Sequence, residues 1–159
     1  MNIHGTFLVA LTLVLATALF VGCKRKTPDG MPKLYPCSVE IVQDGKPLAD
    51  ATVTLSTEEH TWAVSGTTDA SGVAKIYTHG TYPGAPNGNY VVVVSKQIVE
   101  EPEAQQVSAS DAISGGKAYN LVAPEFGSKD TTPLKIEVNG KTNGSFDVGA
   151  AIRDEVKAL

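Results

Sequence analysis

The sequence predicts an all-β protein, a β-sandwich of about seven short strands, and three observations support this fold class. Short runs alternate between apolar and polar residues with a period of two, as a strand with one buried face does. Turn sequences rich in glycine, proline, asparagine and aspartate separate these runs. Glycine and proline contribute 15 and 9 of the 159 residues, which favours many turns over long helices.

The first two strands are expected on either side of the dipeptide Asp44-Gly45. Glycine adopts a positive φ without steric cost, so this dipeptide favours a tight reversal. Pro47 then enters the second strand at a position where a missing N–H is tolerable. The inward-facing residues are expected to be Cys37, Val39 and Ile41 on the first strand and Ala51, Val53 and Leu55 on the second, with Thr52, Thr54 and Ser56 facing water.

Later strands follow the same alternation. They are expected at 62–68, 73–78, 89–95, 134–138 and 145–148. In the turn TDASG, Asp69 can accept hydrogen bonds from backbone amides ahead of it. The stretch YPGAPNG is dense in residues that break strands and predicts a loop. The sequence NGKTNG predicts a hairpin that joins the last two strands, and its NGS tripeptide at 143–145 is interpreted as part of the turn.

Residues 1–22 have the pattern of a signal peptide. Thr6 to Gly22 is an uncharged, mostly apolar run, short for a membrane span but suited to the apolar region of a signal sequence. The residues Phe20-Val21-Gly22-Cys23 resemble the lipobox of bacterial lipoproteins, in which the cysteine is acylated. This resemblance implies a lipid anchor at Cys23 and a place in the bacterial cell envelope, on the periplasmic or outer surface. The alternative is an uncleaved anchor helix.

The rest of the chain is divided into three parts. Residues 23–34 are charged and contain two prolines, so they are expected to form a flexible tether. Residues 35–148 form the sandwich, although the stretch Gln97–Gly116 is polar and carries no recognised motif. Residues 149–159 place Ile152, Val156 and Leu159 at helical spacing, which predicts a short helix or a frayed tail.

Composition excludes several classes of function. A net charge of −4 gives no basic surface for nucleic acid. The only cysteine besides Cys23 is Cys37, so no disulfide scaffold is expected. Its alternation with Val39 and Ile41 makes Cys37 a small buried core residue, with a reactive or metal-binding thiol as the alternative.

Four motifs in order resemble one family. The chain contains DGKPLADATVTL, GTTDASG, PNGNYVVVV and APEFG, followed by the last pair of strands. Together they look like the transthyretin-like, carboxypeptidase-regulatory-like β-sandwich domains of small bacterial envelope lipoproteins. The resemblance covers Tyr35 to about Val148. It implies two sheets with Greek-key-like connections, no cofactor, and a binding or structural role.

Two other functions are weighed against this one. A divergent transthyretin-like hydrolase would need His60 or His79 to meet a carboxylate in a pocket, and the Tyr-Arg-Gly-Ser motif of the enzymatic branch is absent from the sequence. A carbohydrate-binding protein could use Trp62, Tyr77 and Tyr82 as a stacking platform. A metal site at the sequence TEEH is not expected, because adjacent residues rarely converge on one ion.

The strand at 89–95 suggests where a partner would bind. Tyr90, Val92 and Val94 are expected to face the core, yet Val91 and Val93 on the other face are apolar too. A strand with two apolar faces is usually covered on both. The cover would be the tail, the polar excursion or another protein, so Val91 and Val93 mark a possible docking surface. The sequence therefore predicts a non-catalytic, membrane-anchored binding or structural module.

Overall fold

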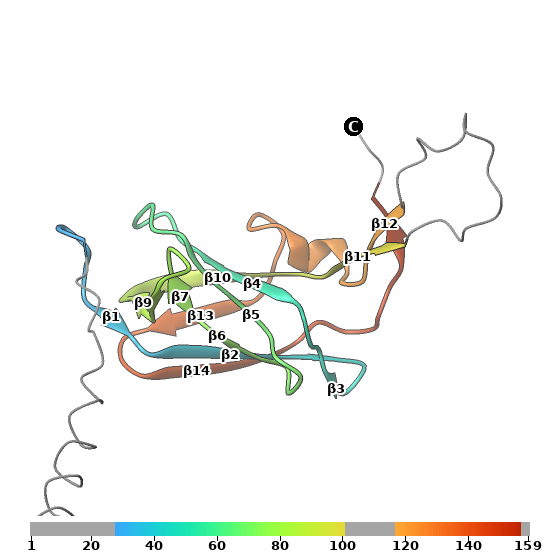
Figure 1. Ribbon diagram of the computed structural model, residues 1–159, viewed down its shortest axis with the longest axis horizontal. Helices are drawn as coiled ribbons and strands as arrows, with labels where there is room; N and C mark the ends of the chain where they lie inside the picture. The colour runs from blue at the N-terminus through green and yellow to red at the C-terminus, as the bar shows by residue number, and fades with distance from the viewer. Residues whose placement is uncertain (1–27, 101–116, 157–159) are drawn as a thin grey trace, which may run out of the picture. The chain divides into compact units, whose positions relative to one another are not determined.

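The computed structural model describes residues 28–100 and 117–156, and it confirms the all-β class (Figure 1). Two sheets form a sandwich around one apolar core. Cys23, the signal sequence, the first part of the expected tether (residues 23–27) and Leu159 lie outside the described residues. The tether's last residue, Leu34, pairs with the sandwich as part of the short strand β1, Leu34–Tyr35, against β9, Ala85–Pro86.

The four-stranded sheet is built around β2, Cys37–Gln43. Its neighbour on one side is β14, Thr142–Asp147, which runs parallel to it. On the other side it pairs antiparallel with β3, Lys46–Pro47, and β6, Val73–Lys75. The β2–β3 reversal is the expected Asp44-Gly45 turn, in which both residues have positive φ, 51° and 70°.

The six-stranded sheet has the order β13-β10-β4-β5-β7-β8. Its strands are β4, Thr52–Ser56; β5, Val64–Thr67; β7, Tyr77–Thr78; β8, Tyr82–Pro83; β10, Gly88–Ser95; and β13, Lys135–Val138. The loop expected at 82–88 thus contains the two short strands β8 and β9. A 3₁₀ helix, η2, Pro124–Gly127, precedes β13 and contributes Phe126 to the core.

The chain crosses between the two sheets several times. It does so from β3 to β4, from β5 to β6, from β6 to β7 and from β13 to β14. Seven strands of these two sheets have three or more residues, in agreement with the expected number: β2, β4, β5, β6, β10, β13 and β14.

The predicted alternation of faces is confirmed on the strands that form the core. Val39, Ile41, Val53 and Val92 are fully buried, and Tyr90 is 2% exposed. Cys37 is 7% exposed. Inward apolar side chains from both sheets meet between the layers, which is the main source of stability for a sandwich.

The predicted hairpin between the last two strands is wrong. β13 pairs with β10 in the six-stranded sheet, whereas β14 pairs with β2 in the other sheet. Residues 143–145 lie inside β14 rather than in a turn. The two strands do face each other across the core, since a Cβ added at Gly144 would lie 2.8 Å from the side chain of Ile136.

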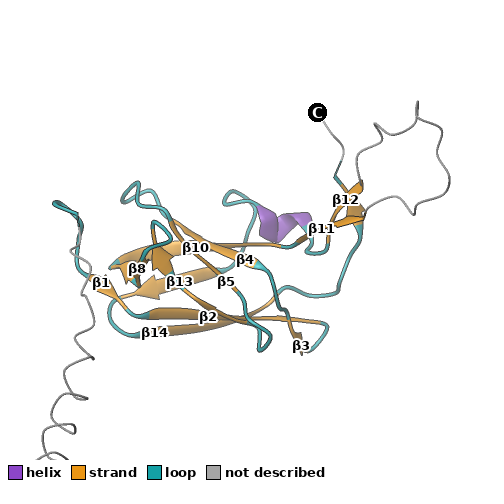
Figure 2. Ribbon diagram, viewed as in Figure 1, coloured by secondary structure: helices purple, strands orange, loops and turns teal. Residues whose placement is uncertain are grey.

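Two expectations about the end of the chain also change. Part of the polar excursion, Gln97–Glu100, is strand β11, and it pairs with β12, Lys117–Asn120. The short helix expected in the tail is not formed in its described part, where Asp154–Glu155 is β15 and pairs with β12. The three strands form a small separate sheet, so neither segment covers β10 in the part of the chain that is described (Figure 2).

Candidate binding cleft

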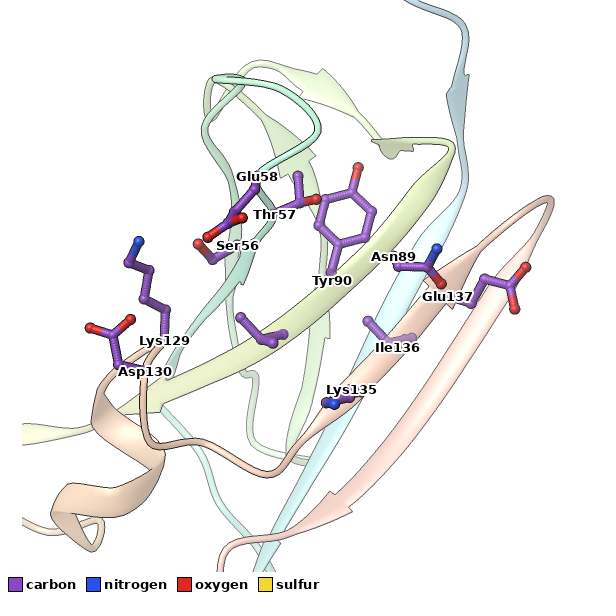
Figure 3. Close-up of a pocket in the computed structure, with 11 residues that line it drawn as sticks. Ser56, Thr57, Glu58, Asn89, Tyr90, Lys129, Asp130, Lys135, Ile136 and Glu137 are labelled. Carbon is purple, nitrogen blue, oxygen red and sulfur yellow. The ribbon is translucent and has the colours of Figure 1, made fainter.

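A cleft of about 460 Å³ lies on the outer face of the six-stranded sheet (Figure 3). Its floor is formed by β10 and β13. The loop after β4 forms one wall, and the loop between η2 and β13 forms another. The lining residues are Ser56, Thr57, Glu58, Asn89, Tyr90, Val91, Lys129, Asp130, Lys135, Ile136 and Glu137.

Strand register places Val91 in the floor. Val91 is the partner of Ser56 on β4 and of Lys135 on β13, so these three side chains form a row across the sheet. Val91 is half-buried. The predicted docking residue therefore lies in this cleft, whereas Val93, also half-buried, is not among the residues that line it. Val93 is the partner of Thr54 on the same outer face.

The rim of the cleft carries charge of both signs. Five charged side chains line it: Glu58, Lys129, Asp130, Lys135 and Glu137. Within residues 28–100 and 117–156 the ion pairs are Lys117–Glu155 and Arg153–Glu100, both in the small sheet. The rim charges are therefore not engaged in ion pairs with described residues. Figure 3 shows Glu58 and Lys129 on facing walls.

Sequence reasoning identified the floor of the cleft but missed the rim. The alternation of β13 could have placed Lys135 and Glu137 on the outer face beside Val91. Lys129 and Asp130 lie in a loop with no periodic pattern. Only the folded chain brings them to the wall opposite Glu58.

A chain of hydrogen bonds supports the wall after β4. The Trp62 amide donates to Nδ1 of His60 over 3.2 Å, so the imidazole carries its proton on Nε2. Nε2 lies 2.8 Å from the Tyr90 hydroxyl, which in turn donates to the Pro86 carbonyl over 2.9 Å. Burial is the main cause that raises the pKa of Tyr90 to about 12, and the nearby Glu59 carboxylate contributes to the same rise. The phenol therefore remains neutral and keeps donating to Pro86.

The structure places both histidines away from the arrangement that a hydrolase would need. His60 bonds Tyr90 and the Trp62 amide rather than a carboxylate. His79 packs edge-on against Trp62, with ring centroids 5.2 Å apart. Neither histidine lines the cleft. His60 lies in the loop after β4, where its ring is half-buried and hydrogen-bonded.

The three aromatic residues considered for sugar stacking do not form one platform. Tyr82 is the partner of Thr78, whereas Tyr77 is the neighbour of Thr78 along β7 and points to the other face. Trp62 packs against the core beside His79. Tyr77 instead lines a second cleft, of about 500 Å³, together with Thr52, Ser65, Gly66, Thr67, Asp69, Val73, Lys75 and Gly80.

Cys37 is the core residue that the alternation predicts. Its side chain is buried, and burial raises the pKa of the thiol to about 11. A thiol with so high a pKa is a poor nucleophile at neutral pH. Among the residues the structure describes, no group of three or more His, Cys, Asp or Glu side chains could hold a metal ion.

Within the described ranges, no helix is long and apolar enough to cross a membrane.

Comparisons with known proteins identify no family. No family model matches the chain, and no curated protein matches it significantly. Among solved structures, the chain is similar to a 9R-lipoxygenase from Cyanothece PCC8801, with 18% sequence identity and a TM-score of 0.36. The similarity covers 77% of this chain but only 18% of the lipoxygenase chain, so this chain spans about a fifth of that protein. A likeness this low carries no functional argument.

Proposed function

We propose that this protein is a lipoprotein of the bacterial cell envelope, anchored through Cys23, whose sandwich is a non-catalytic binding module. The cleft around Val91 is its binding surface. One observation carries the proposal: an apolar floor lies among five charged side chains that form no ion pair within the described part of the chain. Charges at a concave surface that form no ion pair with described residues are available to a ligand.

The chemistry of the cleft favours a protein segment as the ligand. Two lysines and three carboxylates line the rim, so a polyanion or a polycation would meet like charges there. A segment with an apolar side chain flanked by charges of both signs would match the floor and the rim. Val91 would contact the apolar side chain, and Lys135 and Glu58 would contact the charged ones.

The anchor is supported by the sequence, since Phe20-Val21-Gly22-Cys23 follows the apolar run at the position where lipoproteins are acylated. Two or more acyl chains on one cysteine hold a protein stably at a membrane. The resemblance to transthyretin-like envelope lipoproteins supports the same assignment.

Fractionation of cells tests the anchor. In a bacterial host the full chain is expected in the membrane pellet after a high-salt wash, and Cys23→Ala is expected in the soluble fraction. Cys37→Ala is the matched control and should stay in the pellet. If Cys23→Ala also stays in the washed pellet, the lipid anchor is ruled out in favour of an uncleaved helix.

Site-specific photo-crosslinking tests the cleft. A photoreactive phenylalanine analogue in place of Lys135 should give a discrete adduct in the envelope. The same analogue at Lys46, an exposed residue of β3 outside the cleft, should not. Val91→Glu should abolish the adduct at Lys135. Equal adducts from both positions would contradict binding at the cleft.

A second candidate function is binding of carbohydrate at the second cleft. The hydroxyl groups of Thr52, Ser65 and Thr67 and the ring of Tyr77 line it together, and sugars are bound by such hydroxyls beside an aromatic face. Glycan-array binding that is lost in Tyr77→Ala and kept in Trp62→Ala would support this function. Loss in Trp62→Ala alone would contradict this location.

A further inference from the structure

The strand β14 has one edge with which no described strand pairs, here called its open edge. Its other edge pairs with β2, because the Thr142 amide donates to the Pro36 carbonyl and the Val148 amide donates to the Val42 carbonyl. Backbone groups alternate between the two edges along a strand in a parallel ladder. The amides and carbonyls of Asn143, Ser145 and Asp147 therefore point away from β2, and no described strand pairs with them.

This edge has few of the features that usually prevent pairing, and its one charged residue, Asp147, is the last residue of the strand. Natural edge strands are short, or carry lysine, proline or a bulge. The strand β14 has six residues, among them no lysine and no proline. By contrast, the edge strand β13 of the other sheet has four residues, and Lys135 and Glu137 project from it. The open edge of β14 is thus suited to accept another strand.

We propose that the open edge of β14 pairs antiparallel with β14 of a second copy of this chain, around a two-fold axis. In this arrangement the outward-pointing residues of the two strands must lie opposite one another. When Gly144 lies at the axis, Asn143 lies opposite the second copy's Ser145. Lys141 then lies opposite the second copy's Asp147, and the symmetry repeats each pair.

Charge selects this register over its neighbours. Lys141 precedes the strand and Asp147 ends it, and both side chains are exposed. An antiparallel copy brings the positive start of one strand to the negative end of the other, so two ion pairs form. A slip by two residues in either direction leaves both charges without a partner. An unrelated strand would match this pattern only by chance, which favours a second copy.

The pairing adds backbone hydrogen bonds rather than a large apolar area. The paired segment, from Lys141 to Asp147, spans about 20 Å at the usual rise of a strand. The two four-stranded sheets would become one sheet of eight strands. Interfaces of this small size give weak association. Confinement to a membrane through an anchor would raise the local concentration, but the pairing itself does not depend on it.

A charge swap tests the ion pairs. Two differently tagged copies of the full chain are co-expressed, and recovery of one with the other from detergent extracts is measured. Lys141→Glu or Asp147→Lys places like charges opposite each other twice, so each variant should associate about tenfold more weakly with itself. Co-expression of Lys141→Glu with Asp147→Lys restores opposite charges at both positions and should restore recovery.

This test separates association from folding. Asp147 accepts a hydrogen bond from the Gly149 amide, so its replacement can destabilise the fold. A variant that had merely unfolded would not be rescued by the complementary variant. Lys46→Glu, an exposed position on β3 at the opposite edge of the same sheet, is the matched control and should associate like the wild type. Weakening by both single variants without rescue in the mixture overturns the proposal.

Cysteine cross-linking tests the register. Directly opposite residues of an antiparallel pair have Cα atoms about 5.5 Å apart, within the reach of a disulfide. Chains with Asn143→Cys and chains with Ser145→Cys should cross-link when mixed in membranes. Each variant alone places its cysteines at diagonal positions about 7–8 Å apart and should not cross-link above the wild-type background. Equal cross-linking in all samples, or none in the mixture, overturns the register.

Discussion

Replacing Tyr90 with phenylalanine should destabilise the fold through a single oxygen atom. The hydroxyl of Tyr90 joins His60, in the wall of the cleft, to the Pro86 carbonyl before β10. Tyr90 is 2% exposed and Pro86 is fully buried, so water cannot replace the hydroxyl without a rearrangement. Phenylalanine keeps the ring and its packing and removes only the two hydrogen bonds.

The expected magnitude follows from the groups left behind. A buried acceptor without a partner costs about 1–3 kcal/mol, and here the Pro86 carbonyl loses its donor. The Nε2–H of His60 loses its acceptor as well, but this ring is only half-buried and can turn toward water. We therefore expect Tyr90→Phe to lower the free energy of unfolding by about 2 kcal/mol.

Urea denaturation followed by circular dichroism measures this difference. Tyr82→Phe is the matched control, because within the described residues the Tyr82 hydroxyl makes no hydrogen bond in the structure. It should change the free energy of unfolding by less than about 0.5 kcal/mol. If Tyr90→Phe is as stable as Tyr82→Phe, the hydrogen-bond chain contributes nothing and the reasoning is refuted.

Three further predictions concern single positions. With the other cysteine replaced by alanine, Cys37 should react with iodoacetamide at pH 8 only as fast as the protein unfolds. The thiol of Cys37 has a pKa of about 11 in the folded protein and 9.0 ordinarily, so its contribution to the free energy of unfolding is complete below pH 9 and is lost toward pH 11. Thermal unfolding measured between pH 9 and pH 11 should show this loss in the wild type and not in Cys37→Val. Gly84→Ala should destabilise by at least about 2 kcal/mol in urea, because φ is 106° and the Cβ would lie 2.4 Å from a backbone oxygen of β1. Val92→Thr, in the core, should lower the free energy of unfolding by about 2 kcal/mol, whereas Val91→Thr, in the cleft, should lower it by less than about 1 kcal/mol. Equal losses in the two variants would contradict the faces assigned to these residues.

The strand faces could be predicted from the sequence because burial imposes a local pattern. Val39 and Ile41 alternate with polar neighbours, and the structure buries both completely. The Asp44-Gly45 turn could also be predicted, since a positive φ at both positions restricts the residues that occur there. In both cases the decisive interaction lies within a few residues of chain.

Pairing between strands could not be predicted in the same way. The alternation along β13 and β14 indicates which side chains face inward, but it does not indicate the neighbouring strand. A two-sheet core buries Ile136 equally well whether β14 lies beside it or across from it. The chain adopts the second arrangement, in which β14 joins β2 over a sequence distance of more than a hundred residues.

In the tail the sequence pattern predicts a short helix, but the structure has the strand β15 there. Ile152 and Val156 have helical spacing, yet a segment of this length has little helical stability of its own. Backbone pairing with β12 is available instead, and Arg153 gains an ion pair with Glu100 and a position over the Tyr119 ring, 4.3 Å from its centroid. Pairing with β12 therefore decides the conformation of the tail, and the helical spacing of two apolar residues does not.

The cleft and the open edge belong to different sheets, and this separation has a testable consequence. The cleft lies on the outer face of the six-stranded sheet, whereas the proposed pairing extends the four-stranded sheet through β14. Lys141→Glu should therefore weaken self-association and leave photo-crosslinking from Lys135 unchanged. Val91→Glu should abolish that crosslink and leave self-association unchanged. Loss of both properties in either variant would show that ligand and second copy share one surface.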